Sequence, residues 1–261
     1  MTNIIVPIDF STTSYNAAHY ASQLVKDHKG LTMVLYHMYN SPSDEAEAAS
    51  ELGRLQIVLT EKNPVKITTL LKQGSDLIDE LEKEVKIQAA NLIVMGITGR
   101  SALAQKFIGS NTLKMAERKV CPVLIVQENA EYSDIKNVML ASDMQNAYYS
   151  TPVEPIKKFL KTFKPKLNIV NVNSDHYVAI TESYEKEKKA LQDLFKEFNP
   201  EFYFIRLFDR EDAIHLFATE KDIDLVITIQ KDHSLLHKLF KASDTKNLTY
   251  HSSVPVLVVH E

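Results

Sequence analysis

Short apolar runs of strand length alternate along the chain with stretches in which apolar residues recur at helical spacing. Between residues 17 and 25 this spacing follows a capping sequence, Ser11-Thr12-Thr13, and ends near Gly30, a residue suited to a helix stop. In the first half the predicted strands cover residues 3–9, 32–38, 65–71, 91–96 and 122–127, and further helices are predicted at 44–62, at 76–88 and from about 109. This alternation predicts a mostly parallel sheet covered by helices on both faces.

The same order occurs a second time. The run from Asn3 to Asp9 corresponds to the run from Asn137 to Asp143, and Pro122 corresponds to Pro255 near the end of each half. The strands predicted for the second half cover residues 138–142, 167–172, 201–208, 225–229 and 256–260. Pro152 and Pro155 fall where its first helix should begin, so we expect that helix to be delayed or irregular. The chain is therefore predicted to form two tandem five-stranded α/β domains, residues 1–128 and 133–261, joined by a short polar linker.

Composition adds limits to this picture. Hydrophobic residues make up 44% and charged residues 25% of the 261 residues, which is ordinary for a globular protein. A formal net charge of -4 and a pI near 6.2 argue against nucleic acid as a partner. No apolar stretch is long enough for a membrane span, no leader sequence is evident, and the single cysteine suits a reducing compartment. We expect a cytoplasmic protein.

The candidate ligand-binding residues follow the first and fourth predicted strands. Asp9 ends the first strand, and the fourth leads into the pattern Gly96-x2-Gly99-x9-Gly109-Ser110. In a parallel sheet these loops meet at the carboxyl edge, where ligands bind. Glycines allow positive φ and close approach to a phosphate, and a helix starting at Gly109 and Ser110 favours an anion. Asp9 is expected to accept hydrogen bonds from a ribose or an adenine amino group; the alternative is a helix cap, although Ser11 already supplies one.

The glycines are unevenly distributed. All six lie in the first half, and three of them form the motif. In the second half Ile229, Asp232 and Ala242 occupy the corresponding positions, while Asp143 and Ser243 are kept. Side chains at the first two of these positions would crowd a phosphate, and Asp232 would repel it. We expect the second site to have lost triphosphate binding.

Taken together, three motifs resemble the universal stress protein family: Val-Pro-Ile-Asp-Phe-Ser at residues 6–11, Tyr36-His37-Met38, and the spaced glycines followed by Cys-Pro-Val-Leu-Ile-Val. The resemblance is strong over residues 1–128, weaker over 133–261, and indicates a tandem member. It implies Rossmann-like domains similar to the adenine-nucleotide alpha hydrolases. It also implies pairing through the last strands, so that the two copies would form an internal pseudo-dimer; a homodimer of chains remains open.

The resemblance further implies binding of ATP, or of AMP or ADP, with Mg²⁺ as an accompanying ion. Asp9 would meet the ribose or adenine, the backbone near Met38 the adenine, and the glycine loop the phosphates. The implied nucleotide-binding residues are Asp9, Met38, Gly96, Thr98, Gly99, Arg100, Gly109, Ser110 and Asn111. Asn111 departs from the small apolar residue frequent at its position, and Arg100 and Lys106 also suit a solvated surface.

Other candidates have simpler interpretations. His37 is expected to pack or hydrogen-bond locally, and His233 with His237 lacks a third ligand nearby in sequence. The aromatic residues between Phe195 and Phe208 are expected to serve packing, with an apolar ligand in the second domain as the alternative. No nucleophile with a base is evident. We therefore expect an ATP-binding stress-response regulator acting on an unknown protein partner, with slow ATP hydrolysis or nucleotidyl transfer as the enzymatic alternative.

Overall fold

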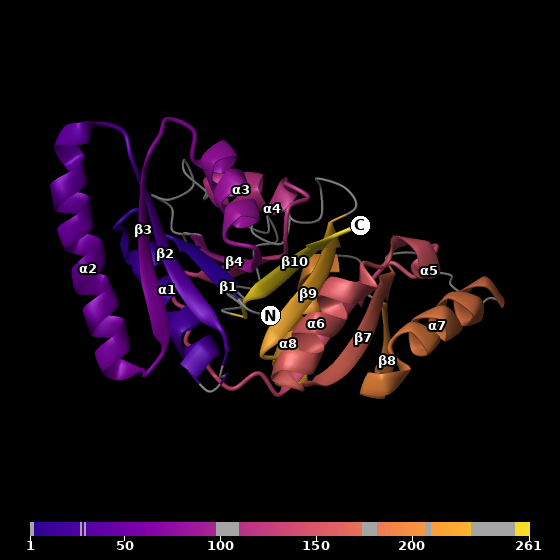
Figure 1. The fold of residues 1–261 in the computed structure, drawn as a ribbon. Coiled ribbons are helices and arrows are strands. Elements are labelled where there is room, and N and C mark those ends of the chain that lie inside the picture. The colour runs from indigo at the N-terminus through magenta and orange to yellow at the C-terminus, as the bar shows by residue number, and fades with distance from the viewer. Residues whose placement is uncertain are drawn as a thin grey trace. The chain divides into compact units, whose positions relative to one another are not determined.

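The structure is a computed structural model that describes residues 3–26, 28, 30–97, 110–173, 182–206, 210–230 and 254–261 (Figure 1). The chain divides into two compact units, Met1–Tyr132 (unit 1) and Ser133–Glu261 (unit 2). Both have the predicted α/β architecture, and each is considered by itself below.

Unit 1 contains a parallel sheet in the strand order β3-β2-β1-β4-β5. The first three strands in the sequence therefore lie in order, β1, β2 and β3. The chain then crosses to the other side of β1 for its last two strands. The strands are β1 (Asn3–Pro7), β2 (Thr32–Tyr39), β3 (Lys66–Gln73), β4 (Ala90–Ile97) and β5 (Val123–Gln127). All five predicted strands are confirmed to within two residues at each end.

Among the described residues, four α-helices connect these strands: α1 (Thr12–Lys26), α2 (Glu45–Lys62), α3 (Leu77–Ile87) and α4 (Ser110–Glu117). A 3₁₀ turn, η1 (Pro42–Asp44), precedes α2. Because parallel strands are joined by right-handed crossovers, α1 and α2 cover one face of the sheet and α3 and α4 the other (Figure 1). Asp76 starts α3 by accepting hydrogen bonds from the backbone N–H groups of Ile78 and Asp79.

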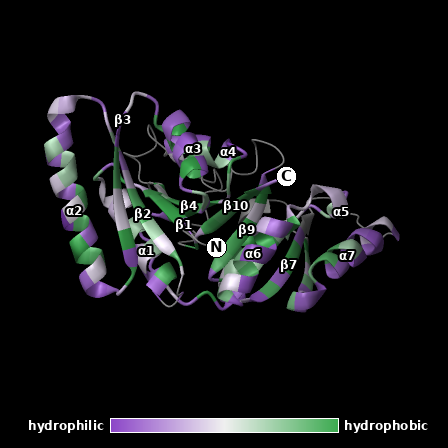
Figure 2. Cartoon of the chain, viewed as in Figure 1, coloured by the Kyte–Doolittle hydropathy of each residue, from purple (hydrophilic) through white to green (hydrophobic). Residues whose placement is uncertain are grey.

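The sheet of unit 1 is apolar on both faces at its centre. Ile4, Ile5 and Val6 of β1 are fully buried, and so are Leu92 to Val94 of β4. Figure 2 shows β1 and β4 in the green of hydrophobic residues, whereas α2 alternates between green and purple along its length. Burial on both faces explains why these strands are continuous apolar runs in the sequence.

Unit 2 repeats this topology with the strand order β10-β9-β6-β7-β8, again parallel. Its strands are β6 (Asn137–Ser142), β7 (Lys166–Asn173), β8 (Glu201–Arg206), β9 (Leu225–Gln230) and β10 (Val256–His260). Its helices are α5 (Ala147–Ser150), α6 (Val153–Phe163), α7 (Glu182–Leu194) and α8 (Arg210–Glu220), with a 3₁₀ turn η3 (Lys196–Phe198) before β8. The expected irregular first helix is confirmed: a short α5 is followed by Pro152 and then by α6.

Side-chain hydrogen bonds secure the chain on each side of the boundary between the units. In unit 1, the Asn16 amide donates to the carbonyl oxygens of Gln127 and Ala130, each at 3.0 Å. In unit 2, the Asp224 carboxylate accepts from the backbone N–H groups of Lys136 and Asn137, each at 2.8 Å. None of the described helices is both long and apolar enough to span a bilayer.

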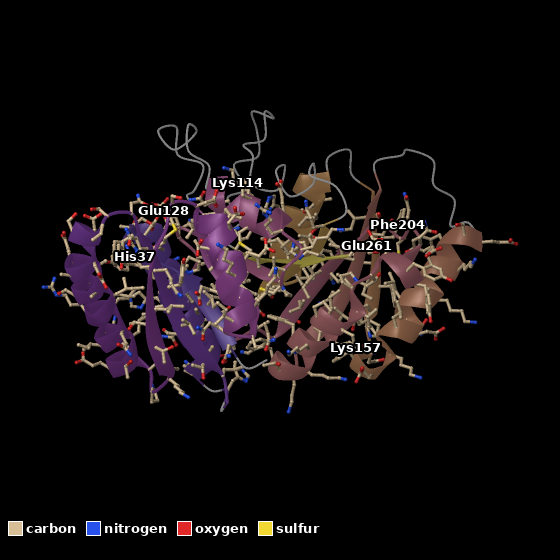
Figure 3. The ribbon with its side chains drawn as sticks, turned by 45° about the horizontal axis from the view of Figure 1, so that its top comes forward. His37, Lys114, Glu128, Lys157, Phe204 and Glu261 are labelled. Carbon is tan, nitrogen blue, oxygen red and sulfur yellow. The ribbon has the colours of Figure 1, made fainter. Side chains whose placement is uncertain are left out.

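The aromatic residues of unit 2 pack against one another around β8. Tyr203 contacts Phe217 of α8 with ring centroids 4.9 Å apart, and Phe204 contacts Tyr184 of α7 at 5.5 Å. Phe195 is fully buried. Phe204 is labelled in Figure 3. These contacts agree with the expected packing role; Phe208 lies outside the described residues.

Candidate functional site

Asp9 follows β1 at the carboxyl edge of unit 1, in a tight turn. Its Oδ1 accepts hydrogen bonds from the Ser11 backbone N–H at 3.1 Å and from the Ser11 hydroxyl at 2.6 Å. Between them Phe10 has a φ of 63°, in the left-handed region that a bulky residue rarely adopts. The turn holds the carboxylate at the surface, where Asp9 is exposed.

Ser11, not Asp9, caps the following helix. The Ser11 hydroxyl oxygen accepts from the backbone N–H of Ser14 at 3.1 Å, and the Ser11 carbonyl accepts the first helical bond, from Tyr15. Asp9 instead fixes Ser11 from the preceding turn. The capping alternative for Asp9 therefore does not describe its contacts, and its carboxylate is positioned as part of the turn that begins α1.

The Asp9 carboxylate is held in its charged form. Partial burial raises its pKa, but the hydrogen bonds donated by the Ser11 hydroxyl and backbone N–H act in the opposite direction, and the pKa is lowered from its ordinary value of 3.8. At neutral pH this group is an ionised acceptor beside the carboxyl end of β1. Such a group suits hydroxyl or amino donors of a ligand.

His37 lies at the carboxyl end of β2, next to this turn (labelled in Figure 3). Its Nδ1 is 2.7 Å from the carbonyl oxygen of Ile8, and its ring centroid is 4.4 Å from that of Phe10. The expected local hydrogen bonding is confirmed. Since a carbonyl only accepts, Nδ1 carries the proton in this contact.

Met38, the next residue of β2, packs beside Gly74. A Cβ added at Gly74 would lie only 2.9 Å from the Met38 sulfur, so the sulfur occupies the space that a side chain there would need. The Gly74 backbone N–H donates to the Tyr39 carbonyl at 3.0 Å. The backbone of Met38 thus lies at the same sheet edge as Asp9, because β2 is the neighbour of β1.

Gly96 lies in β4, on the other side of β1, and its backbone conformation differs from the predicted one. Only Gly30 has a positive φ among the glycines that the structure describes, so Gly96 is ordinary extended strand. A Cβ at Gly96 would lie 2.5 Å from the carbonyl oxygen of Thr13 and 2.7 Å from its methyl carbon. The missing side chain makes room for the first turn of α1, a physical reason that differs from the positive φ expected from the sequence.

The remaining predicted residues fall in the sequence between the end of β4 and the first turn of α4. Thr98, Gly99, Arg100 and Gly109 lie outside the described residues, as does Lys106. Ser110 is the first residue of α4, and Asn111 is exposed in its first turn. The next residue, Thr112, is buried, and its hydroxyl donates to the Gly96 carbonyl at 2.7 Å.

Sequence reasoning missed Thr13 and Thr112. Each contacts Gly96, yet both are ordinary polar residues near a helix start, and nothing in their spacing separates them from capping residues. The local signal for Ser11 was present, as a serine two residues after an aspartate, a common arrangement for a side-chain turn.

Comparison with known proteins identifies the first half of the chain. Residues 1–127 match the model of the universal stress protein family. The first half of the chain belongs to the universal stress protein family. A universal stress protein of Methanocaldococcus jannaschii is 27% identical over 142 residues, which span 48% of this chain and 81% of that protein. The fold of the two units fits a tandem universal stress protein, as the motifs suggested.

Solved structures of universal stress proteins share this fold. The crystal structure of one from Archaeoglobus fulgidus has a TM-score of 0.71 at 18% identity and covers 99% of this chain and 98% of its own. A universal stress protein solved in complex with cAMP has a TM-score of 0.41 at 22% identity, covering 49% of this chain and 98% of its own. The first of these alignments shows that the fold extends over both units.

Unit 2 keeps the turn of unit 1. Asp143 corresponds to Asp9, and its Oδ1 accepts from the Gln145 backbone N–H at 3.1 Å. Met144, like Phe10, is left-handed, with a φ of 53°. The Asn171 amide donates to the Ser142 carbonyl at 3.0 Å, which repeats the contact of His37 with Ile8. The carboxylate half of the site is thus built alike in both units.

The two units diverge at the position of Gly96. Gly96 pairs with Val126, and Ile229 pairs with Val259, so the register of the strands places Ile229 where unit 1 has Gly96. Unit 2 has no continuous counterpart of α1: Asn146 is left-handed, and Ala147, at the position of Thr13, donates its backbone N–H to Glu187 of α7 at 2.7 Å. A side chain at this strand position would collide with a helix that starts as α1 does.

Proposed function

We propose that unit 1 binds an adenine nucleotide, ATP or its di- or monophosphate, at the carboxyl edge of its sheet between β1 and β4. The observation that carries this proposal is the strand order. The chain leaves β1 toward β2 and later returns to β4, so the strand order reverses between β1 and β4, and the carboxyl edge at such a reversal is the usual place for a ligand in an open α/β sheet. Asp9 follows β1, and α4 begins after the loop that follows β4.

The residues on the two sides of this point in the sheet offer complementary chemistry. The ionised Asp9 carboxylate accepts hydrogen bonds from ribose hydroxyls or the adenine amino group, and the backbone of Met38 lies on the adjacent strand. The first turn of α4, with Ser110 and Asn111, offers phosphates the N–H groups that have no partner within the helix and the positive end of a helix dipole. In this proposal Gly96, Thr98, Gly99, Arg100 and Gly109 complete the phosphate side.

Mg²⁺ would enter this site with the nucleotide. The part of the chain that the structure describes holds no group of three or more His, Cys, Asp or Glu side chains suited to a metal. Mg²⁺ keeps much of its water shell and is often held by substrate phosphates with one or two carboxylates. The described residues therefore fit a Mg²⁺ ion that is held mainly by the nucleotide phosphates, and not one that is held by a set of protein ligands alone.

The biological role that we propose is regulatory. Occupancy of unit 1 would act as a slow signal in the cytoplasm, and unit 2 would serve as a structural or partner-binding half. Support comes from the membership of unit 1 in the universal stress protein family and from the divergence of unit 2 at Ile229. Pairing between the two copies and homodimer formation stay predictions.

Calorimetric titration of the full chain with ATP tests the proposal. We expect one nucleotide per chain, with binding abolished in Asp9→Ala and unchanged in Asp143→Ala, which makes the same substitution in the equivalent turn of unit 2. Two equivalent sites, or no binding by the native chain, would contradict the model. Mass spectrometry of any nucleotide released from the purified protein would identify the natural ligand.

A further inference from the structure

Gly96 is held between the first turns of two helices that lie on opposite faces of the sheet. On one face the backbone of Thr13 occupies the space where a Cβ would be. The Gly96 carbonyl accepts the hydroxyl of Thr112 from the start of α4. One residue at the end of β4 therefore contacts the first turn of α1, which begins after the Asp9 turn, and the first turn of α4.

Of the two contacts of Gly96, the one with Thr112 is a buried hydrogen bond. Thr112 is 4% exposed, and its hydroxyl lies 2.7 Å from the Gly96 oxygen. The two residues lie 16 positions apart in the sequence, one near the end of β4 and the other in the first turn of α4, so their hydrogen bond ties the start of this helix to the strand. A contact that holds the start of a binding helix in place meets part of the entropic cost of ordering it before any ligand arrives.

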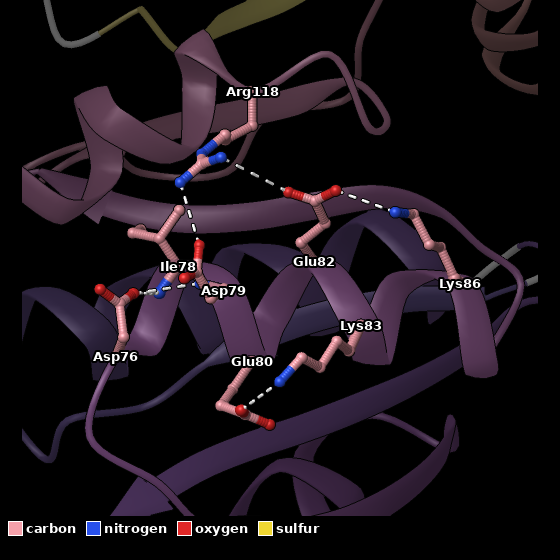
Figure 4. A network of polar contacts seen from close by, with 8 residues as sticks. All are labelled: Asp76, Ile78, Asp79, Glu80, Glu82, Lys83, Lys86 and Arg118. Atoms are coloured by element: carbon pink, nitrogen blue, oxygen red, sulfur yellow. Dashed lines mark hydrogen bonds and ion pairs between the residues drawn. The ribbon is translucent and has the colours of Figure 1, made fainter.

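The other end of α4 is held less firmly. Arg118, directly after α4, lies 3.0 Å from an Asp79 oxygen and 3.8 Å from a Glu82 oxygen of α3, and Glu82 also contacts Lys86 (Figure 4). The side chains of Arg118 and Asp79 are about half exposed, and such pairs add little to stability. The buried bond of Thr112 is thus the stronger constraint on the position of α4.

We propose that Thr112 is a positioning residue of the nucleotide site, which presets the N-terminus of α4 by donating a hydrogen bond to the Gly96 carbonyl. The inference rests on the proposed nucleotide binding of unit 1 and adds a specific consequence. Thr112 acts on the phosphate side only, because the Asp9 turn has its own hydrogen bonds through Ser11. Loss of the Thr112 hydroxyl therefore weakens binding of ATP and spares binding of adenosine.

Titration of the full chain with ATP and with adenosine, for the native protein, Thr112→Val and Thr112→Ser, tests this. Valine keeps the shape and removes the hydroxyl, whereas serine keeps the hydroxyl. We expect Thr112→Val to weaken ATP binding about 3- to 10-fold, as for the loss of one hydrogen bond, with adenosine binding unchanged and Thr112→Ser close to native. Arg118→Ala is the matched control at the other end of α4 and should leave both affinities unchanged.

The outcomes separate the two proposals. A native chain that binds no ATP overturns the nucleotide site itself. If the native chain binds ATP and Thr112→Val binds it equally well, or loses ATP and adenosine to the same extent, the positioning role is wrong and the nucleotide site stands. Should Thr112→Val fail to fold, Thr112→Ser and Thr112→Ala give the same comparison, since these two variants differ only in the hydroxyl.

Discussion

The carbonyl oxygen of Thr13 lies 2.5 Å from the point where Gly96 would carry a Cβ. Real Cβ atoms do not approach a carbonyl so closely, so α1 can begin where it does only because residue 96 has no side chain. Unit 2 supports this interpretation, since Ile229 occupies the same strand position and the corresponding helix is split into α5 and α6.

Gly96→Ala should therefore destabilise unit 1. The added methyl meets backbone atoms of α1, which cannot rotate away, so we expect a loss of about 2 kcal/mol in the free energy of unfolding, within the usual range for overpacking. Urea unfolding followed by circular dichroism measures it.

Gly53→Ala provides the control for this prediction. Gly53 lies inside α2 with no atom within 4 Å of its added Cβ, so alanine should stabilise the protein by about 0.5–1 kcal/mol through its higher helix propensity. Equal effects of the two substitutions would show that the contact with Thr13 is not what matters at Gly96.

Asp9 gives stability a dependence on acid pH. Its pKa in the folded chain is lowered from 3.8, because the hydrogen bonds from Ser11 outweigh partial burial. The folded state thus binds a proton less readily than the unfolded state, and the contribution of Asp9 is complete above about pH 4 and is lost as the pH falls through the folded-state pKa.

The variant Asp9→Asn isolates this contribution, because its amide oxygen still accepts from Ser11 and does not titrate. In urea unfolding between pH 3 and pH 6, the stability advantage of the native protein over the variant should be constant at the upper end and shrink toward pH 3. Parallel curves over the whole range would argue against a lowered pKa.

Much of this molecule could be predicted from the sequence, because the strands of a parallel sheet are long apolar runs and the pattern occurs twice. The position of Asp9 at the carboxyl edge followed from the same reasoning. The reason why residue 96 is a glycine could not be predicted, because its contact with Thr13 joins residues from distant parts of the chain. From the sequence alone, Gly96 followed by Gly99 indicates a phosphate loop at least as strongly. The contact of Thr112 could not be predicted either, because its partner is a backbone carbonyl, and every residue type has one.

Lys164 carries backbone strain that a glycine would remove. It ends α6 with a φ of 53°, its backbone N–H donates to the Leu160 carbonyl at 2.7 Å, and its side chain is exposed. This is the left-handed position at which glycine is preferred. Lys164→Gly should stabilise unit 2 by about 0.5–1 kcal/mol in urea unfolding, whereas Lys164→Ala should give no gain, since alanine retains the Cβ penalty. A gain with alanine would point to the lysine charge as the cause.

Tyr36 buries a hydroxyl that has no hydrogen-bond partner in the described chain. Its side chain is fully buried, and burial together with the nearby Glu80 and Glu84 raises the pKa of its hydroxyl to about 12. An unsatisfied buried polar group costs about 1–3 kcal/mol, so deleting it should not be harmful. Tyr36→Phe is expected to leave the free energy of unfolding unchanged or to raise it by about 1 kcal/mol. Tyr203→Phe makes the same change where the hydroxyl donates to Glu201 at 2.6 Å, and it should be neutral to slightly destabilising. A clear loss of stability in Tyr36→Phe would reveal a partner for this hydroxyl, such as a buried water molecule.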